Sequence, residues 1–404
     1  MEMFGRKLFA MFFLSFLFST VQGQEQRLQS IEQENRQLKN WLKRIEQNLG
    51  AQTYTSKQDH ALLPSYRGRQ FKLGGELEFE YIDTENGTGV KKPYGYTKID
   101  KFTLLPSARI SDDITLEALL IFKMGSPKSP LSEAYTIFSN LAYDSKLTVG
   151  LDDSFINEWP SRKTESFALI DTAFARDDSL GLVWESTKNP LFWHMSLTNG
   201  YELGKSAVSE DASYKILHDN RQESEVNSNK QLGVGLGYRL DLGARRSLAI
   251  MGFGFQSELY NGDIATLQAI SGYGASTDIT QSRHGVAIDY KGQSSVLGAK
   301  WISAQDGVLK RSGWYLQSGY RIKLSASSWF RSITPFVRYG VLDVDLANDP
   351  ADNLTWNRNM TTLALLADVT KGVKLKAEYY LNGEETGGAE IDNNEFMLQL
   401  EVKF

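Results

Sequence analysis

Apolar and polar positions alternate along most of this chain. In residues 71–82 (FKLGGELEFEYI) the odd positions are mostly apolar, and the even positions carry glutamates and a lysine. Residues 395–404 (EFMLQLEVKF) repeat the pattern and end on an aromatic residue. Because successive side chains of a strand point to opposite faces, such segments predict β-strands with one apolar and one polar face.

Similar segments recur along the chain, at residues 114–122, 147–151, 191–198, 232–240, 314–322 and 373–380. Short polar turns separate some strands (111–113, 144–146, 371–372), and longer polar stretches separate others (83–96, 201–229, 261–283, 343–357). Short turns at one end and long loops at the other are typical of outer-membrane barrels. Residues 71–404 are therefore predicted to form an all-β fold, a transmembrane antiparallel β-barrel of about 16 strands.

A soluble β-sandwich is the alternative, because its strands alternate in the same way and bury their apolar faces against a second sheet. The strand pattern alone does not separate the two folds. Strand length, an unbroken series of strands and aromatic residues near strand ends favour the barrel, which also leaves no unpaired sheet edge in the lipid. The residues that could form the aromatic girdles are Tyr81, Tyr143, Trp184, Trp193, Tyr238, Tyr260, Tyr290, Trp301, Trp314, Tyr339 and Tyr379.

The N-terminus has the features of an export signal. Arg6 and Lys7 precede an apolar run at residues 8–18, and small residues lie just before Gln24. The run is too short to span a membrane as a helix, so residues 1–23 are predicted to be a cleaved signal peptide. A buried core helix is the alternative. The signal peptide places the mature protein in the bacterial cell envelope.

Residues 24–50 show a heptad repeat. The repeat predicts a short α-helical coiled coil ahead of the barrel, in which a buried asparagine sets the register at a cost in stability. A single amphipathic helix lying on the protein surface is the alternative. Residues 51–70 are predicted to be a polar linker. The predicted core positions of the coil are Leu28, Ile31, Asn35, Leu38, Leu42, Ile45 and Leu49.

Composition excludes several other classes of protein. The chain has 404 residues, no cysteine and a formal net charge of −5. Its mean hydropathy of −0.35 excludes a bundle of transmembrane helices. The absence of cysteine excludes thiol chemistry, and the negative charge argues against nucleic-acid binding. The four histidines are scattered, and the sequence indicates no cofactor or metal site.

Several short motifs resemble the phosphate-selective (O/P-type) porins of bacterial outer membranes. The resemblance implies a sixteen-stranded trimeric channel preceded by a coiled coil, with arginines and lysines lining the constriction. This sequence departs from that pattern, since residues 152–163 (DDSFINEWPSRK) mix acids with bases. The matching segments are FKLGGEL (71–77), LTVGL (147–151), SLTNG (196–200), GWYLQSGY (313–320), TPFVRY (334–339) and the terminal strand.

The loop at residues 152–166 is the best candidate for the constriction of the pore. Opposed charges across a pore orient polar solutes, whereas rings of one sign select ions. The simpler interpretation is that such charges only solvate a water-filled wall. The candidate pore residues are Asp152, Asp153, Glu158, Arg162, Lys163 and Arg176 in the loop region, and Lys101, Arg109, Lys374 and Lys376 on polar strand faces.

The predicted function is passive diffusion of small hydrophilic solutes or anions, phosphate included, through an outer-membrane porin. The predicted partners are outer-membrane lipid and further copies of the chain, most simply as a homotrimer with the coil in the periplasm. One alternative is a structural tether in which the coil binds peptidoglycan. Another is a barrel hydrolase, which would need a histidine beside a serine or aspartate at the rim. We expect no enzyme activity.

Overall fold

The structure is a computed structural model that describes residues 70–85, 95–123, 129–157, 159–174, 179–187, 190–208, 214–221, 230–325, 329–346, 352–388 and 391–404. These residues belong to one compact unit, Gly68–Phe404. The predicted signal peptide and coiled coil, and all of the predicted linker except Gln70, lie outside the described residues, so all three stay predictions.

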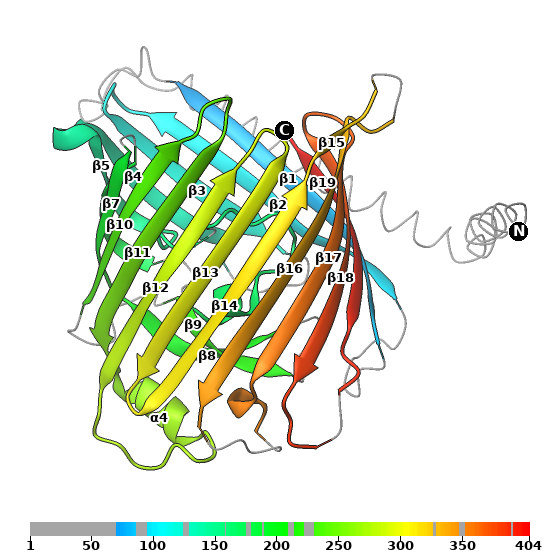
Figure 1. The fold of residues 1–404 in the computed structure, drawn as a ribbon. Coiled ribbons are helices and arrows are strands. Elements are labelled where there is room, and N and C mark those ends of the chain that lie inside the picture. The colour runs from blue at the N-terminus through cyan, green and yellow to red at the C-terminus, as the bar shows by residue number, and fades with distance from the viewer. Residues whose placement is uncertain are drawn as a thin grey trace, which may run out of the picture. The chain divides into compact units, whose positions relative to one another are not determined.

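Sixteen strands form a closed antiparallel barrel (Figure 1), which confirms the predicted architecture. Each strand pairs with the next one around the ring, and β1 closes the barrel by pairing with β19. The first seven strands are β1 (Phe71–Thr84), β2 (Tyr96–Arg109), β3 (Ile114–Phe122), β4 (Leu131–Leu141), β5 (Ser145–Asp152), β6 (Ser179–Ser186) and β7 (Leu191–Thr198).

The other barrel strands continue the ring from β7. The two-residue strand β15 (Ile322–Lys323) only extends the sheet beside β16. The remaining nine strands are β10 (Gln231–Asp241), β11 (Ser247–Glu258), β12 (Thr280–Lys291), β13 (Ser295–Asp306), β14 (Leu309–Tyr320), β16 (Ser332–Asp345), β17 (Arg358–Asp368), β18 (Val373–Glu384) and β19 (Glu395–Lys403).

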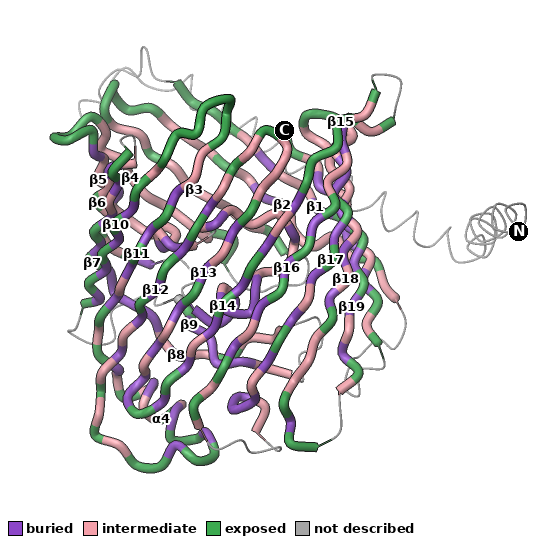
Figure 2. Tube along the Cα trace, viewed as in Figure 1, coloured by how far each residue is buried: buried purple, intermediate pink, exposed green. Residues whose placement is uncertain are grey.

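The apolar residues of the alternating pattern form the outer surface of the barrel. Along β10, exposed Leu232 and Leu236 alternate with buried glycines (Figure 2). Gly235 and Gly237 lie on the inner face, where the rings of Phe155 and Phe192 pack against them. A Cβ atom on Gly237 would lie 2.2 Å from Phe192 Cζ. The exposed apolar side chains form a surface suited to lipid.

Most short connections lie at one end of the barrel and most long ones at the other, as the sequence predicts, although the two-residue turn between β13 and β14 lies at the end with the long loops. The described residues 110–113 and 369–372 form tight turns at the end where Phe404 bonds to Gly75. The connections from β5, β7 and β11 leave the other end and are much longer. Short turns face the periplasm in outer-membrane barrels, so the predicted placement would put the long loops outside the cell.

Two predicted polar loops contain secondary structure instead. Residues 201–229 include a separate two-stranded sheet, β8 (Tyr201–Ala207) and β9 (Lys215–Arg221), and residues 261–283 include the helix α4 (Asn261–Gln268). The shorter elements are α3 (Leu169–Ala173), η1 (Ala142–Asp144) and η2 (Asn353–Thr355). Among the described residues, no helix is both long and apolar enough to cross a membrane.

Part of the barrel interior is apolar, which the alternating pattern does not predict. Side chains on the inner faces of β7 and β11–β14 form one buried cluster with the loop after β5 and the β8–β9 hairpin. Both faces of β11 are therefore apolar, since its inner side chains contact protein and its outer ones face lipid. The cluster includes Ile156, Leu169, Ile170, Phe174, Phe192, Ile216, Met251, Phe253, Phe255 and Ile302.

Candidate pore constriction

The loop that follows β5 folds into the barrel and crosses its bore. Arg338 on β16 donates to the backbone oxygen of Ser166 over 2.9 Å, and β16 stands opposite β5 in the strand order of the ring. Gln317 on β14 donates to the backbone oxygen of Ser161 over 3.2 Å. Polar side chains of the far wall therefore hold the backbone of this loop.

Glu165 of the loop contacts four other residues. Its carboxylate lies 3.1 Å from Lys376 Nζ, 3.7 Å from Lys101 Nζ and 3.8 Å from Arg162 Nη1. Its backbone N–H donates to both carboxylate oxygens of Glu378, at 2.9 and 3.1 Å. Burial alone would raise the pKa of Glu165, but the three cations outweigh it and hold that pKa well below its usual range.

Lys300 on β13 fixes a second part of the loop. Its ammonium group lies 2.8 Å from Asp171 Oδ1 and donates to the backbone oxygen of Ile156 over 2.9 Å. The apolar residues Leu169 and Ile170 of α3 pack into the buried cluster beside it. The loop is thus held by charged contacts on both sides and by apolar burial in between.

The β8–β9 hairpin closes much of the remaining interior through a buried ion network. Asp219 on β9 lies 2.7 Å from Arg283 and 3.3 Å from Arg311, and Asp306 binds both arginines at 2.8 and 2.7 Å. All four side chains are essentially inaccessible to solvent. His218 Nδ1 lies 2.7 Å from the backbone oxygen of Thr172, which joins the hairpin to the loop. The two inserted segments therefore support each other.

The open space lies on the other side of the loop, where a cavity of about 490 Å³ is bounded by β1–β4, β19 and the loop. Its described lining is mostly polar or charged, with an apolar strip formed by Leu105, Leu119 and Ile121. Its acidic residues are Glu76, Glu80, Asp100, Glu133, Asp153, Glu165 and Glu395. Its basic residues are Lys98, Lys101, Lys123 and Arg162.

The structure brings several predicted pore residues to this cavity. Asp153, Arg162 and Lys101 line it, and Lys376 contacts the loop through Glu165. Asp152 ends β5 immediately before the loop, and its side chain accepts a hydrogen bond from the backbone of Asp153.

The other predicted residues are placed elsewhere. Lys374 lies 3.7 Å from Glu401 on the inner wall, and Lys163 lies on the loop. Arg109 ends β2 and pairs with Asp112 in an exposed turn, so the structure does not bring it to the constriction. Glu158 and Arg176 lie outside the described residues.

Sequence reasoning missed the anchors of the loop. Glu165 lies in the predicted loop and Glu378 in a predicted strand (373–380), but no sequence signal links positions 213 residues apart. Arg338 lies on the same strand face as apolar Phe336 and polar Thr334, so the sequence does not show that it points inward. Lys300 and Asp171 gave no motif at all.

Acidic side chains cluster on the wall beside the loop. Carboxylate oxygens of Glu78, Glu80, Asp100 and Glu165 come within 4.8 Å of one another. Lysine ammonium groups already bind this cluster, since Lys98 lies 3.2 Å from Glu80 and Lys101 lies 3.1 Å from Glu78. We therefore interpret the cluster as a charge network of the pore wall and not as a metal centre.

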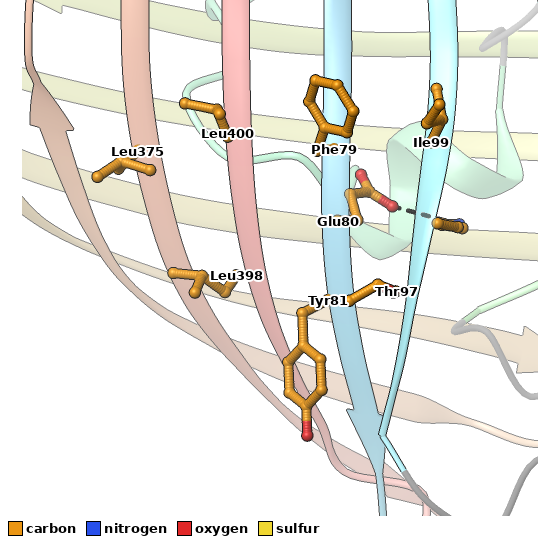
Figure 3. Close-up of a pocket in the computed structure, with 9 residues that line it drawn as sticks. Phe79, Glu80, Tyr81, Thr97, Ile99, Leu375, Leu398 and Leu400 are labelled. Atoms are coloured by element: carbon orange, nitrogen blue, oxygen red, sulfur yellow. Dashed lines mark ion pairs between the residues drawn. The ribbon is translucent and has the colours of Figure 1, made fainter. Parts of the chain in front are cut away.

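A groove of about 470 Å³ follows the outer seam where β18, β19, β1 and β2 meet (Figure 3). Phe79 and Tyr81 line it together with Leu375, Leu398 and Leu400. Glu80 lies between the two aromatic residues in sequence and forms the ion pair with Lys98 that Figure 3 marks. At this seam the outer face of the barrel wall carries apolar residues, and the inner face carries an ion pair.

Comparisons with known proteins identify the fold. No model of a known protein family matches the sequence, and no curated protein sequence matches it. The structure is similar to the outer-membrane channel DcaP of Acinetobacter baumannii, with 12% identity, a TM-score of 0.56 and coverage of 85% of this chain and 99% of that one. OmpF of Salmonella typhi, solved with daunomycin, matches at 10% identity and a TM-score of 0.56, covering 83% and 98% of the two chains.

The trimer form of OmpT, an outer-membrane protein of Vibrio cholerae, is also similar. It shares 10% identity at a TM-score of 0.53, with coverage of 83% of this chain and 99% of that one. At such low identity these similarities establish a shared outer-membrane barrel fold. Membership of the phosphate-selective family stays a prediction.

Proposed function

We propose that this protein is an outer-membrane porin through which small hydrophilic solutes diffuse passively. The observation that carries the proposal is the loop after β5, which charged contacts hold across the bore while a charged cavity stays open beside it. A barrel that served only as an anchor would not need a loop bonded to strands on the opposite wall.

The contacts of the constriction also suggest how it would act on a solute. Lys101 and Lys376 bind Glu165 from the strands, while Arg162 approaches it from within the loop. Charges of both signs fixed on facing surfaces produce a transverse field that orients dipolar solutes as they pass. The mixed lining gives no specific support to phosphate selectivity.

The remaining parts of the proposal concern targeting and assembly. A signal peptide at residues 1–23 would export the chain, and the coil at residues 24–50 would lie in the periplasm and join copies into a homotrimer. A similar outer-membrane protein, OmpT of Vibrio cholerae, has a trimer form. Outer-membrane lipid would contact the exposed leucines, and peptidoglycan is a further partner if the coil reaches the cell wall.

Reconstitution of the full mature chain in planar bilayers tests the proposal. We expect discrete conductance steps, and membranes that stay silent at saturating protein would refute it. Arg162→Ala should raise the single-channel conductance, because it removes a cationic side chain that lines the cavity. Arg245→Ala, in the exposed turn between β10 and β11, is the control and should leave the conductance unchanged.

A further inference from the structure

We propose that the constriction favours small organic cations that carry an apolar group, such as aryl- or alkylammonium ions, over anions of the same size. This inference rests on the proposed channel function and adds a solute class to it. Two independent features of the cavity carry it, namely the sign of its charge and the apolar strip on one of its walls.

The first feature is an excess of negative charge. Seven acidic and four basic residues line the cavity among the described residues, which leaves a formal charge of −3. A narrow, low-dielectric passage with an excess of one sign concentrates counter-ions of the opposite sign. Carboxylate-rich pores accordingly favour cations.

Two basic residues of the wall, Lys98 and Lys101, are also already engaged with acids. Lys98 lies 3.2 Å from Glu80 and 3.0 Å from Asp100, and Lys101 lies 3.1 Å from Glu78. An anion that approached either lysine would have to compete with carboxylates held in place by the barrel. The wall therefore offers an anion little net attraction.

The second feature is the apolar strip on the inner faces of β2 and β3. Leu105 is 44% exposed although it faces the cavity, and Ile121 pairs across the strands with inward-facing Thr103. Large aliphatic side chains in contact with water in a bore lose the free energy that burial would provide. A passing apolar group would recover part of that free energy.

Charge and apolar strip adjoin each other. Leu119 lies opposite Glu133 in the pairing of β3 with β4, and both line the cavity. Side chains directly opposite on antiparallel strands lie about 5 Å apart at their Cβ atoms. A carboxylate beside an apolar surface matches a molecule that joins an ammonium group to a hydrocarbon group.

Channels of the full protein in planar bilayers test the inference through reversal potentials. In a KCl gradient, the reversal potential should have the sign expected of a cation-selective channel. Phenethylammonium should be more permeant than phenylacetate, which has a similar size and the opposite charge. Changing both Glu133 and Asp153 to lysine makes the formal cavity charge +1 and should reverse the sign for KCl. Changing Asp343 and Asp345 to lysine adds the same charge at exposed positions outside the cavity lining and should not reverse it.

The apolar strip has a separate test. Changing Leu119 and Ile121 together to serine should lower the permeability of phenethylammonium relative to potassium, whereas Leu119→Met should not. Channels that conduct but prefer chloride, or that pass phenylacetate as readily as phenethylammonium, would overturn this inference and leave the porin proposal standing. Silent membranes would instead remove the porin proposal.

Discussion

Glu165 and Glu378 are 213 positions apart in the chain, yet the backbone nitrogen of Glu165 lies 2.9 and 3.1 Å from the two carboxylate oxygens of Glu378. One residue belongs to the loop after β5, and the other to strand β18. Their contact is one of several that hold the loop inside the bore, beside the open cavity.

Removing the Glu378 carboxylate should loosen the loop. A hydrogen bond to a charged group contributes about 1.5–3 kcal/mol, and Glu378→Leu removes both acceptors. We expect single-channel recordings to show greater open-channel noise and a higher mean conductance. Glu258→Leu, at the exposed end of β11, is the control. Unchanged noise in the Glu378 variant would show that the contact does not hold the loop.

The ion network of the hairpin predicts a loss of stability. Asp219→Asn leaves buried Arg283 and Arg311 with Asp306 as their carboxylate partner. Breaking a buried ion pair from one side costs on the order of 3 kcal/mol. Urea unfolding of the refolded barrel should show this decrease in the free energy of unfolding. Asp345→Asn, an exposed change, should have no measurable effect.

Asp263 in helix α4 predicts a pH dependence. Burial raises its pKa to about 7, although it accepts a hydrogen bond from the backbone nitrogen of Leu203 at 2.7 Å. The unfolded chain releases the same proton near pH 4, so the stabilising contribution is complete below about pH 4 and is lost as pH rises through about 7.

The thermal midpoint of the protein should therefore fall between pH 5 and pH 8, and it should fall less in Asp263→Asn. Comparing the two proteins isolates this group from others that titrate in the same range. An equal fall in both proteins would exclude Asp263 as the source.

The lipid-facing surface predicts an effect that depends on depth. Leu236, in the middle of β10, is 60% exposed, and Leu240 lies near the end of the same strand. Leu236→Arg should cost about 2–4 kcal/mol in a bilayer, and Leu240→Arg about 0–1 kcal/mol. Unfolding titrations in lipid vesicles measure both. Equal costs at the two positions would contradict the proposed membrane placement.

The coil at residues 24–50 predicts an assembly defect. Its deletion should convert the proposed trimer to monomers on native gels while the conductance steps remain, because the described barrel closes without it. Detachment of the envelope in cells that express the deleted form would instead favour the tether alternative. A trimer that persists after the deletion would mean that the barrel itself carries the subunit contacts.

The sequence by itself determined the β-strands and their apolar faces, and it predicted a barrel of about 16 strands, which the structure confirms. The alternation of apolar and polar positions is a local property, because each strand must present apolar side chains outward whatever lies inside the barrel. Strand β10 could therefore be recognised from residues 231–241 alone. The glycines of that strand could also be assigned to the inner face, although the rings of Phe155 and Phe192 that require them could not be foreseen.

Only the tertiary structure decided what fills the bore. The β8–β9 hairpin, the anchoring of Glu165 and the network around Asp219 join residues far apart in the chain, and their pairing depends on three-dimensional placement that leaves no periodic trace. The inner face of a barrel can contact water or other protein segments. An apolar residue on that face gives the same local sequence pattern in either case. Folding of the inserted segments therefore determines which part of the interior remains open.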